Sequence, residues 1–167
     1  RVTCHNQDDE LLAEINAESM QPMDVDIGLD GPAKATPKVE IEWENVVSGD
    51  VFVKKTWLLS ESENNRYSEE ISDNDPIYKN HIHPHYLLSL ANACLMEEYI
   101  MPAWIHASSI TNHRAALMVG DEITSKSVVK EKFERKGHQF ITLHITYWRG
   151  QELTTDILHT AIFRIAE

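Results

Sequence analysis

One long apolar helix is the feature that most constrains how this chain folds. Between Pro84 and Tyr99, leucine and alanine recur at helical spacing on nearly every side, so the helix has to be buried over most of its circumference. Pro84 stands where the first turn of a helix tolerates proline. A helix of this kind needs a large apolar surface around it, and the rest of the chain has to supply that surface.

Four segments with strand character follow the helix. They are rich in β-branched and aromatic residues, and turns at Gly120, Gly137 and Gly150 separate them. The segments are 104–112, 122–134, 139–148 and 154–165. We predict that they form an antiparallel meander that wraps around the helix, which is an α+β architecture.

The residues before the long helix predict shorter elements. A strand is expected over residues 51–59. A short helix is expected over residues 61–71, because Ser60 is a typical N-cap and the acidic side chains of Glu61 and Glu63 oppose the helix dipole. Residues 72–78 have the composition of a turn and connect this short helix to the long one.

The chain divides into three parts. We predict a β-hairpin over residues 1–23, a linker with glycine and proline over 24–38, and the principal domain over 39–167. Residues 145–163 weakly repeat the plan of the first twenty residues, so the hairpin is interpreted as the end of a preceding repeat. Two unrelated amphipathic hairpins would look equally similar. The chain begins with Arg1 rather than Met, which indicates that the natural start is not represented.

Charge and cysteine content exclude several classes of function. The chain has 15 basic and 27 acidic residues, and its formal net charge of -12 repels nucleic acid. Two cysteines without CxxC spacing predict neither a metal site nor a disulfide. No apolar run approaches the length of a membrane span, so we expect a cytoplasmic protein without membrane contact. The densest basic stretch contains Lys130, Lys132, Arg135 and Lys136. It either contacts an anionic coenzyme or is simply a solvated surface.

The stretch Ser72-Asp73-Asn74-Asp75-Pro76-Ile77-Tyr78 resembles a family motif. It is similar to G-D-x-N-P-[LIV]-H of the MaoC-like, or hydratase-2, family, and it stands at the same place between a short and a long helix. Residues 43–50 resemble that family's W-x-x-V-x-x-G-D opening, and residues 119–121 resemble its second V-G-D. The resemblance covers about residues 40–167 and implies a hotdog fold, in which an antiparallel sheet wraps around a long central helix.

The resemblance also implies roles for three residues of the motif. Asp73 matches the carboxylate that acts with a histidine in adding water across a 2,3 double bond, and Asp75 takes the place of the asparagine that helps to orient it. Such chemistry needs two proton-transfer groups that hold one water within about 3 Å. Tyr78 takes the place of the histidine. An ordinary tyrosine, with a pKa near 10, donates a proton but is a poor base near neutral pH.

Histidines beyond Tyr78 are candidates for the missing imidazole. Of His81, His83 and His85, we select His83 as the third catalytic candidate. Alternatively, His83 and His85 cap or precede the long helix at the surface. Their HxH spacing also suits a metal, but a third ligand is not identifiable, so no metal site is predicted.

Further residues are predicted to bind substrate. Trp104 and His106 resemble a P-W-I-H strand start in one branch of the family, and His106 either lines the acyl tunnel or packs in the core. The full set of predicted substrate-binding residues is Asp75, Trp104, His106, Arg135 and Lys136.

Three functions are compatible with these features. The first is an enoyl-CoA hydratase or 3-hydroxyacyl dehydratase that needs no cofactor and acts on an acyl-CoA or acyl-carrier-protein thioester. The second is a hotdog thioesterase, and the third is a non-catalytic acyl-binding repeat with a degenerate dyad. A homodimer, or a pseudo-dimer of two hotdog repeats, is expected in each case, because a lone sheet leaves an edge strand and a helix face uncovered.

Overall fold

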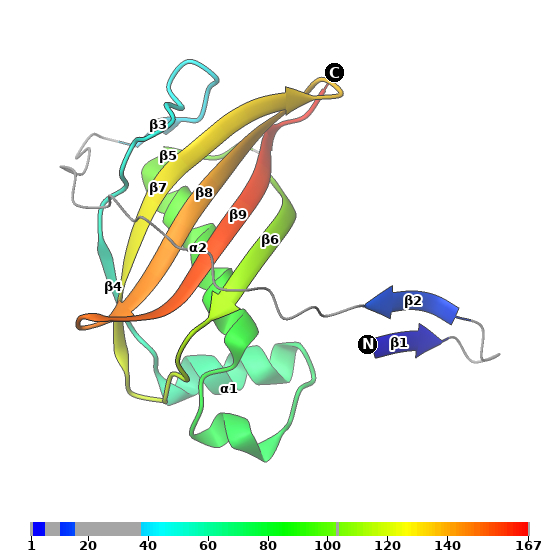
Figure 1. Cartoon of the computed structure of the whole chain (residues 1–167), viewed down its shortest axis with the longest axis vertical. Helices are drawn as coiled ribbons and strands as arrows, with labels where there is room; N and C mark the ends of the chain where they lie inside the picture. Colours follow the sequence, from blue (N-terminus) through cyan, green and yellow to red (C-terminus); the bar gives the residue numbers. More distant parts are fainter. Residues whose placement is uncertain (1, 6–10, 16–37, 103, 167) are drawn as a thin grey trace.

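A five-stranded antiparallel sheet forms the body of the protein. The structure is a computed structural model that describes residues 2–5, 11–15, 38–102 and 104–166. The strands lie in the order β4-β7-β8-β9-β6, and four of them are long and strongly twisted (Figure 1). Their bounds are β4 Lys55–Leu58, β6 Ile105–His113, β7 Glu122–Arg135, β8 His138–Arg149 and β9 Glu152–Arg164.

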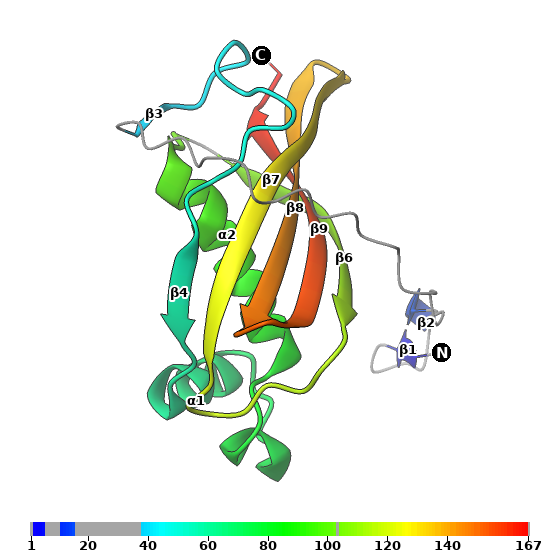
Figure 2. The ribbon, with the colours of Figure 1, turned by 60° about the vertical axis from the view of Figure 1, so that its left-hand side comes forward.

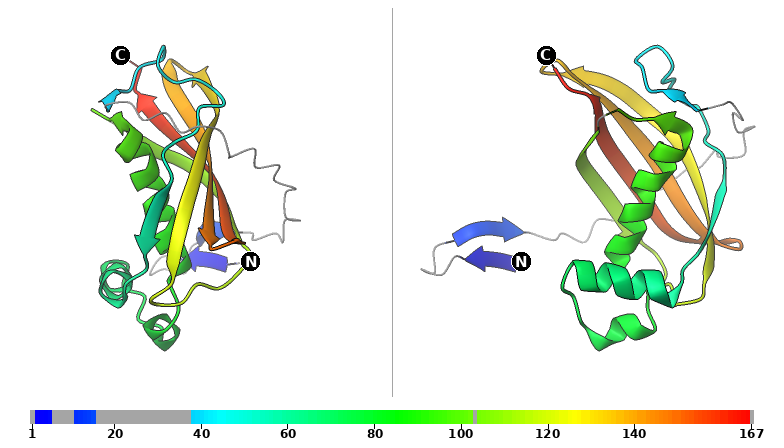
Figure 3. Two further views of the ribbon diagram at one scale, coloured as in Figure 1. Left: turned by 90° about the vertical axis from the view of Figure 1, so that its left-hand side faces the viewer. Right: turned by 180° about the vertical axis from the view of Figure 1, so that it is seen from behind.

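The helix α2, Pro84–Glu98, lies against one face of this sheet (Figures 2 and 3). Its buried residues include Leu87, Leu90 and Leu95, which join the inner-face side chains of the sheet in a single core. The fully buried Tyr147 on β8 donates a hydrogen bond from its hydroxyl to the Leu87 carbonyl oxygen at 3.1 Å. The structure therefore confirms the predicted α+β fold, a sheet wrapped around one long helix.

Two short helices lie between β4 and α2, at one end of the sheet (Figure 1). The helix α1 spans Glu61–Glu70, and the Ser60 hydroxyl accepts the Glu63 N–H at its N-terminus, as the sequence predicted. A 3-10 turn, η1, spans Pro76–Lys79. The face that α1 buries is polar, because its buried residues are Asn64 and Ser68.

The strand predicted over residues 51–59 is shorter than expected. Regular pairing begins at Lys55, whereas Val51 makes only an isolated bridge to Val128. The N–H of Val53 bonds to the Glu98 carboxylate at 2.8 Å instead of to a neighbouring strand. A side chain of α2 thus takes a backbone donor that a continuous strand would need. The sequence also did not predict the short parallel pair β3 (Val39–Glu40) and β5 (Tyr99–Ile100).

Near the start of the chain, β1 (Val2–His5) and β2 (Leu11–Ile15) pair in antiparallel fashion as a separate two-stranded sheet. Residues 1, 6–10 and 16–23 of the predicted hairpin, and all but the last residue of the predicted linker, lie outside the described residues. Whether this pair ends a preceding repeat stays a prediction. Within the described part of the chain, none of the helices is long and apolar enough to cross a membrane.

We predict that Tyr147→Phe lowers the free energy of unfolding by about 1 kcal/mol, because it removes one buried hydrogen bond while keeping the ring that fills the core. Urea denaturation followed by circular dichroism measures the change. An unchanged midpoint of unfolding would show that this bond does not help to hold α2 against the sheet.

Candidate active site

The motif predicted to carry the chemistry follows α1 directly. Ser72 adopts a left-handed conformation, with φ of 59°, where the related motif has glycine. The next residue, Asp73, is anchored by its N–H, which donates to the Ser68 carbonyl oxygen at 2.9 Å. Its Oδ1 accepts the Asp75 N–H at 3.2 Å. Asp75 in turn caps η1 by accepting the Ile77 N–H, and it lies beside Asp73 in the lining of the same cavity.

His83 both caps α2 and contacts Asp73. Its Nδ1 accepts the His85 N–H at 3.1 Å at the N-terminus of the helix. In the neutral ring the proton then lies on Nε2, which is 3.3 Å from Asp73 Oδ2. The His83 side chain is 7% exposed, whereas the Asp73 side chain is 40% exposed. His83 therefore caps the helix, although it is buried rather than at the surface as that alternative expected, and the same side chain contacts Asp73.

Tyr78 completes the group of three candidate catalytic residues. Its ring lies 4.4 Å from the His83 ring, centroid to centroid, with an angle of 45° between the planes. The pKa of Tyr78 is raised above its ordinary value of 10. Burial is the main cause, and the negative charges of Asp73 and Asp75 contribute less. The phenol therefore keeps its proton at neutral pH and is a donor rather than a base.

Asn64 on α1 is a buried residue of the site that sequence reasoning missed. Its Nδ2 donates to the carbonyl oxygens of Tyr78, at 2.7 Å, and His81, at 2.9 Å. Its Oδ1 accepts the His83 N–H at 2.8 Å. The one available signal was a pair of small polar residues, Asn64 and Ser68, spaced four apart on a helix with few apolar residues.

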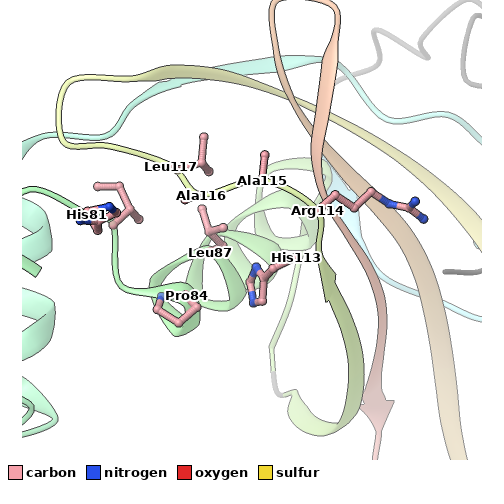
Figure 4. A pocket seen from close by; sticks show the side chains of 9 residues that line it. His81, Pro84, Leu87, His113, Arg114, Ala115, Ala116 and Leu117 are labelled. Atoms are coloured by element: carbon pink, nitrogen blue, oxygen red, sulfur yellow. The ribbon is translucent and has the colours of Figure 1, made fainter. Parts of the chain in front are cut away.

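Two cavities flank this segment. One, of about 320 Å³, is polar and is lined by Asp73, Tyr78 and Lys79 among others. The other, of about 330 Å³, is mainly apolar and lies between the first turn of α2 and the residues that follow β6 (Figure 4). Its lining includes His81, Pro84, Leu87, His113 and Leu117. The Arg114 side chain points away from the other side chains in Figure 4, because its Nε donates to the buried carboxylate of Asp156 at 2.7 Å.

The structure does not bring Trp104 and His106 to Asp73. Instead they surround His159 on the inner face of the sheet: the His106 ring stacks on the His159 ring at 4.9 Å, and the Trp104 ring lies at 6.5 Å. The Ser109 hydroxyl lies between the two imidazoles, 2.9 Å from His106 Nε2 and 2.9 Å from His159 Nδ1. These residues lie at the start of β6. The Asp73 segment lies at the opposite end of the sheet, near the end of β6 (Figure 1).

The predicted basic contact is also remote from Asp73. Arg135 and Lys136 lie at the turn between β7 and β8, at the opposite end of the sheet from α1 (Figure 1). Lys132 donates to the Trp43 carbonyl oxygen, and its Nζ lies 4.5 Å from the centre of the Trp43 ring. A group of three or more histidine, cysteine or acidic side chains suited to a metal ion does not occur among the residues that the structure describes.

Comparisons with known proteins define the class to which this fold belongs. No family model matches the chain, and no curated protein matches its sequence. Among solved structures, an (R)-hydratase from A. caviae is 17% identical with a TM-score of 0.58, covering 71% of this chain and 97% of its own. The R-hydratase PhaJ1 from Pseudomonas aeruginosa is 16% identical with a TM-score of 0.61, covering 77% and 88%.

A third match is the HadBC (3R-hydroxyacyl-ACP dehydratase) complex from Mycobacterium tuberculosis. It is 9% identical with a TM-score of 0.63 and covers 71% of this chain and 98% of its own. These similarities show that the chain has the hotdog fold, which confirms the predicted fold class. At such low identity they show the fold alone, so the activity has to be argued from this chain's own site.

Burial, and to a lesser degree the neighbouring His106, lowers the pKa of His159 to about 4. The unfolded chain binds a proton at this residue near pH 6.5, whereas the folded protein does so only near pH 4, so stability falls as the pH falls between those values. We predict that wild type loses about 2 kcal/mol more than His159→Gln between pH 7 and pH 4.5. Urea denaturation at both pH values measures this difference, and equal losses would mean that His159 is not held neutral.

Proposed function

We propose that this protein hydrates enoyl thioesters, or catalyses the reverse dehydration of 3-hydroxyacyl thioesters, with Asp73 as its proton-transfer group and His83 as the hydrogen-bond donor that orients it. The observation that carries the proposal is the 3.3 Å approach of His83 Nε2 to Asp73 Oδ2. An imidazole is thus present beside the motif carboxylate although Tyr78 occupies the position of the motif histidine.

The geometry gives the two side chains different tasks. The Asp73 carboxylate accepts a proton from the water whose oxygen bonds to C3 of the enoyl group and then donates this proton to C2, so the elements of water add across the double bond without an oxidant or a cofactor. His83, with its proton on Nε2, donates a hydrogen bond to Asp73 and orients the carboxylate. In the reverse direction Asp73 removes the C2 proton and protonates the leaving hydroxyl.

The apolar cavity at the first turn of α2, whose lining does not include Asp73 or His83, supports an acyl substrate. Pro84 and Leu87, which follow His83 in the chain, line it together with Leu117, and its volume of about 330 Å³ suits a short acyl chain. The polar cavity at Asp73 is lined by one cation, Lys79, and by the carboxylates of Glu69, Asp73 and Asp75, so its charge does not favour the phosphates of an acyl carrier. We therefore assign the acyl chain to the apolar cavity.

One observation favours a second function, a non-catalytic acyl-binding repeat. The Asp73 side chain is 40% exposed, so it lacks the dry surroundings that usually accompany proton transfer by a carboxylate, and Tyr78 is not a base at neutral pH. On this account the fold and the apolar cavity are kept for binding while the reaction is lost.

Crotonyl-CoA hydration, followed by loss of the enoyl-thioester absorbance, tests the proposal. We predict that wild type turns over and that Asp73→Asn and His83→Asn each lower kcat about 100-fold or more. Asparagine at position 83 can still cap α2, so the loss reports the imidazole rather than the helix. His144→Asn, the same change on the outer face of the sheet, is the matched control and keeps wild-type kcat.

Two further measurements separate the alternatives. Tyr78→Phe removes the phenol, so a larger loss here than in His83→Asn would make Tyr78 the proton donor. Thiol release from the substrate would indicate a thioesterase. Equal absence of turnover in wild type and Asp73→Asn, with crotonyl-CoA still bound, would support the non-catalytic repeat.

We further propose that a second hotdog domain covers this one. In the described residues β6 pairs with β9 on one side only, so the other edge of a nine-residue strand presents unpaired backbone groups. Ile105 and Ile110 on this strand are 49% and 43% exposed. Pairing with an equivalent edge would satisfy the backbone and cover apolar surface.

We predict that the chain sediments at twice its mass of 19.1 kDa in analytical ultracentrifugation at micromolar concentration. The physical reason is the free edge of β6, which a second copy can extend into a continuous sheet. A single species of 19.1 kDa over the whole concentration range would contradict a homodimer.

A further inference from the structure

Asn64 connects α1 to the loop that carries the candidate dyad. Its side chain is fully buried, and it bonds to three backbone groups of residues 78–83 and to no other side chain in the described structure. An amide can make four such bonds, so nearly all of its capacity serves this one loop. A helix with so polar a buried face holds its neighbour by hydrogen bonds rather than by apolar packing.

The three bonds act on the residues that the proposed chemistry needs. Those to the Tyr78 and His81 carbonyl oxygens fix the path of the chain between the two rings, and the bond from the His83 N–H fixes the backbone from which the imidazole projects. Only with this backbone in place can His83 Nδ1 accept the His85 N–H, which leaves the proton on Nε2, facing Asp73.

We propose that Asn64 is a positioning residue that sets which ring nitrogen of His83 carries the proton. The role in catalysis rests on the proposed hydratase function, whereas the effect on the His83 ring does not. Without Asn64, three backbone groups lose their partner, and the loop can relax to bond elsewhere. The imidazole is then free to rotate or to exchange tautomers, and Nε2 no longer meets Asp73 in a defined geometry.

The test combines a spectroscopic and a kinetic measurement on Asn64→Leu, a nearly isosteric change that removes all three bonds. Long-range ¹⁵N–¹H correlations of the histidine rings, assigned with His83→Asn, distinguish the protonated nitrogen from the bare one. We expect a bare Nδ1 and a protonated Nε2 in wild type, and a mixture of tautomers in Asn64→Leu. We also expect kcat to fall about 100-fold with KM of the same order as in wild type.

Asn92→Leu is the matched control. It makes the same change at a partly buried asparagine on α2 whose Oδ1 lacks a hydrogen-bond partner in the described structure, so the His83 tautomer should stay as in wild type. If Asn64→Leu does not fold, Asn64→Ser replaces it. Serine keeps a single hydroxyl in place of three bonds, and we expect the same mixture of tautomers to a smaller degree.

A wild-type His83 protonated on Nδ1 would overturn the proposal, as would a folded Asn64 variant with an unchanged tautomer. If the tautomer shifts as expected while wild type has no hydratase activity, the positioning role of Asn64 stands and the proposed function fails. If wild type is active and only Asn92→Leu shifts the tautomer, the positioning role fails and the proposed function stands.

Discussion

The N-terminus of α2 is the constraint on which the rest of the site depends. Burying this helix against the sheet places its first turn beside the loop from α1, and the free N–H groups of that turn need an acceptor. His83 supplies the acceptor through Nδ1. A requirement of helix formation therefore determines the direction of Nε2, the nitrogen that meets Asp73, so the fold and the proposed chemistry share one side chain.

This arrangement explains how the chain departs from the motif it resembles. Tyr78 occupies the position of the motif histidine and cannot act as a base, yet its ring packs against an imidazole that comes from five residues further along. Ser72 adopts a left-handed backbone, with φ of 59°, at the position where the motif has glycine. The imidazole of the proposed site thus comes from a position outside the motif.

Helices and strands that follow a short repeating pattern of apolar residues could be predicted from the sequence. The 3.6-residue spacing over α2 and the turn residues between the strands gave the long helix and the four long strands, because local sequence decides both. His83 was selected with Asp73, and the structure brings the two together. The absence of regular pairing at the start of the predicted strand 51–59 could not be predicted. It arises because the side chain of Glu98, which is far away in sequence, accepts the Val53 N–H.

The positions of residues that act across the tertiary structure could not be derived from the sequence. Trp104 and His106 were predicted from a resemblance to bind substrate, and the structure places both beside His159. Arg135 and Lys136 form a basic stretch in sequence, and a β-turn carries them to the far end of the sheet. Asn64 has no motif, because its role consists of bonds to backbone groups between 14 and 19 residues away.

The most direct test of the account is a crystal structure of the Asp73→Asn protein with a bound short 3-hydroxyacyl-CoA. The account predicts that C2 and C3 of the acyl group lie within about 3.5 Å of the residue 73 side chain and of His83 Nε2, with the acyl chain in the cavity lined by Pro84, Leu87 and Leu117. Thioester bound in that cavity with C2 and C3 turned away from both side chains would contradict the proposed dyad.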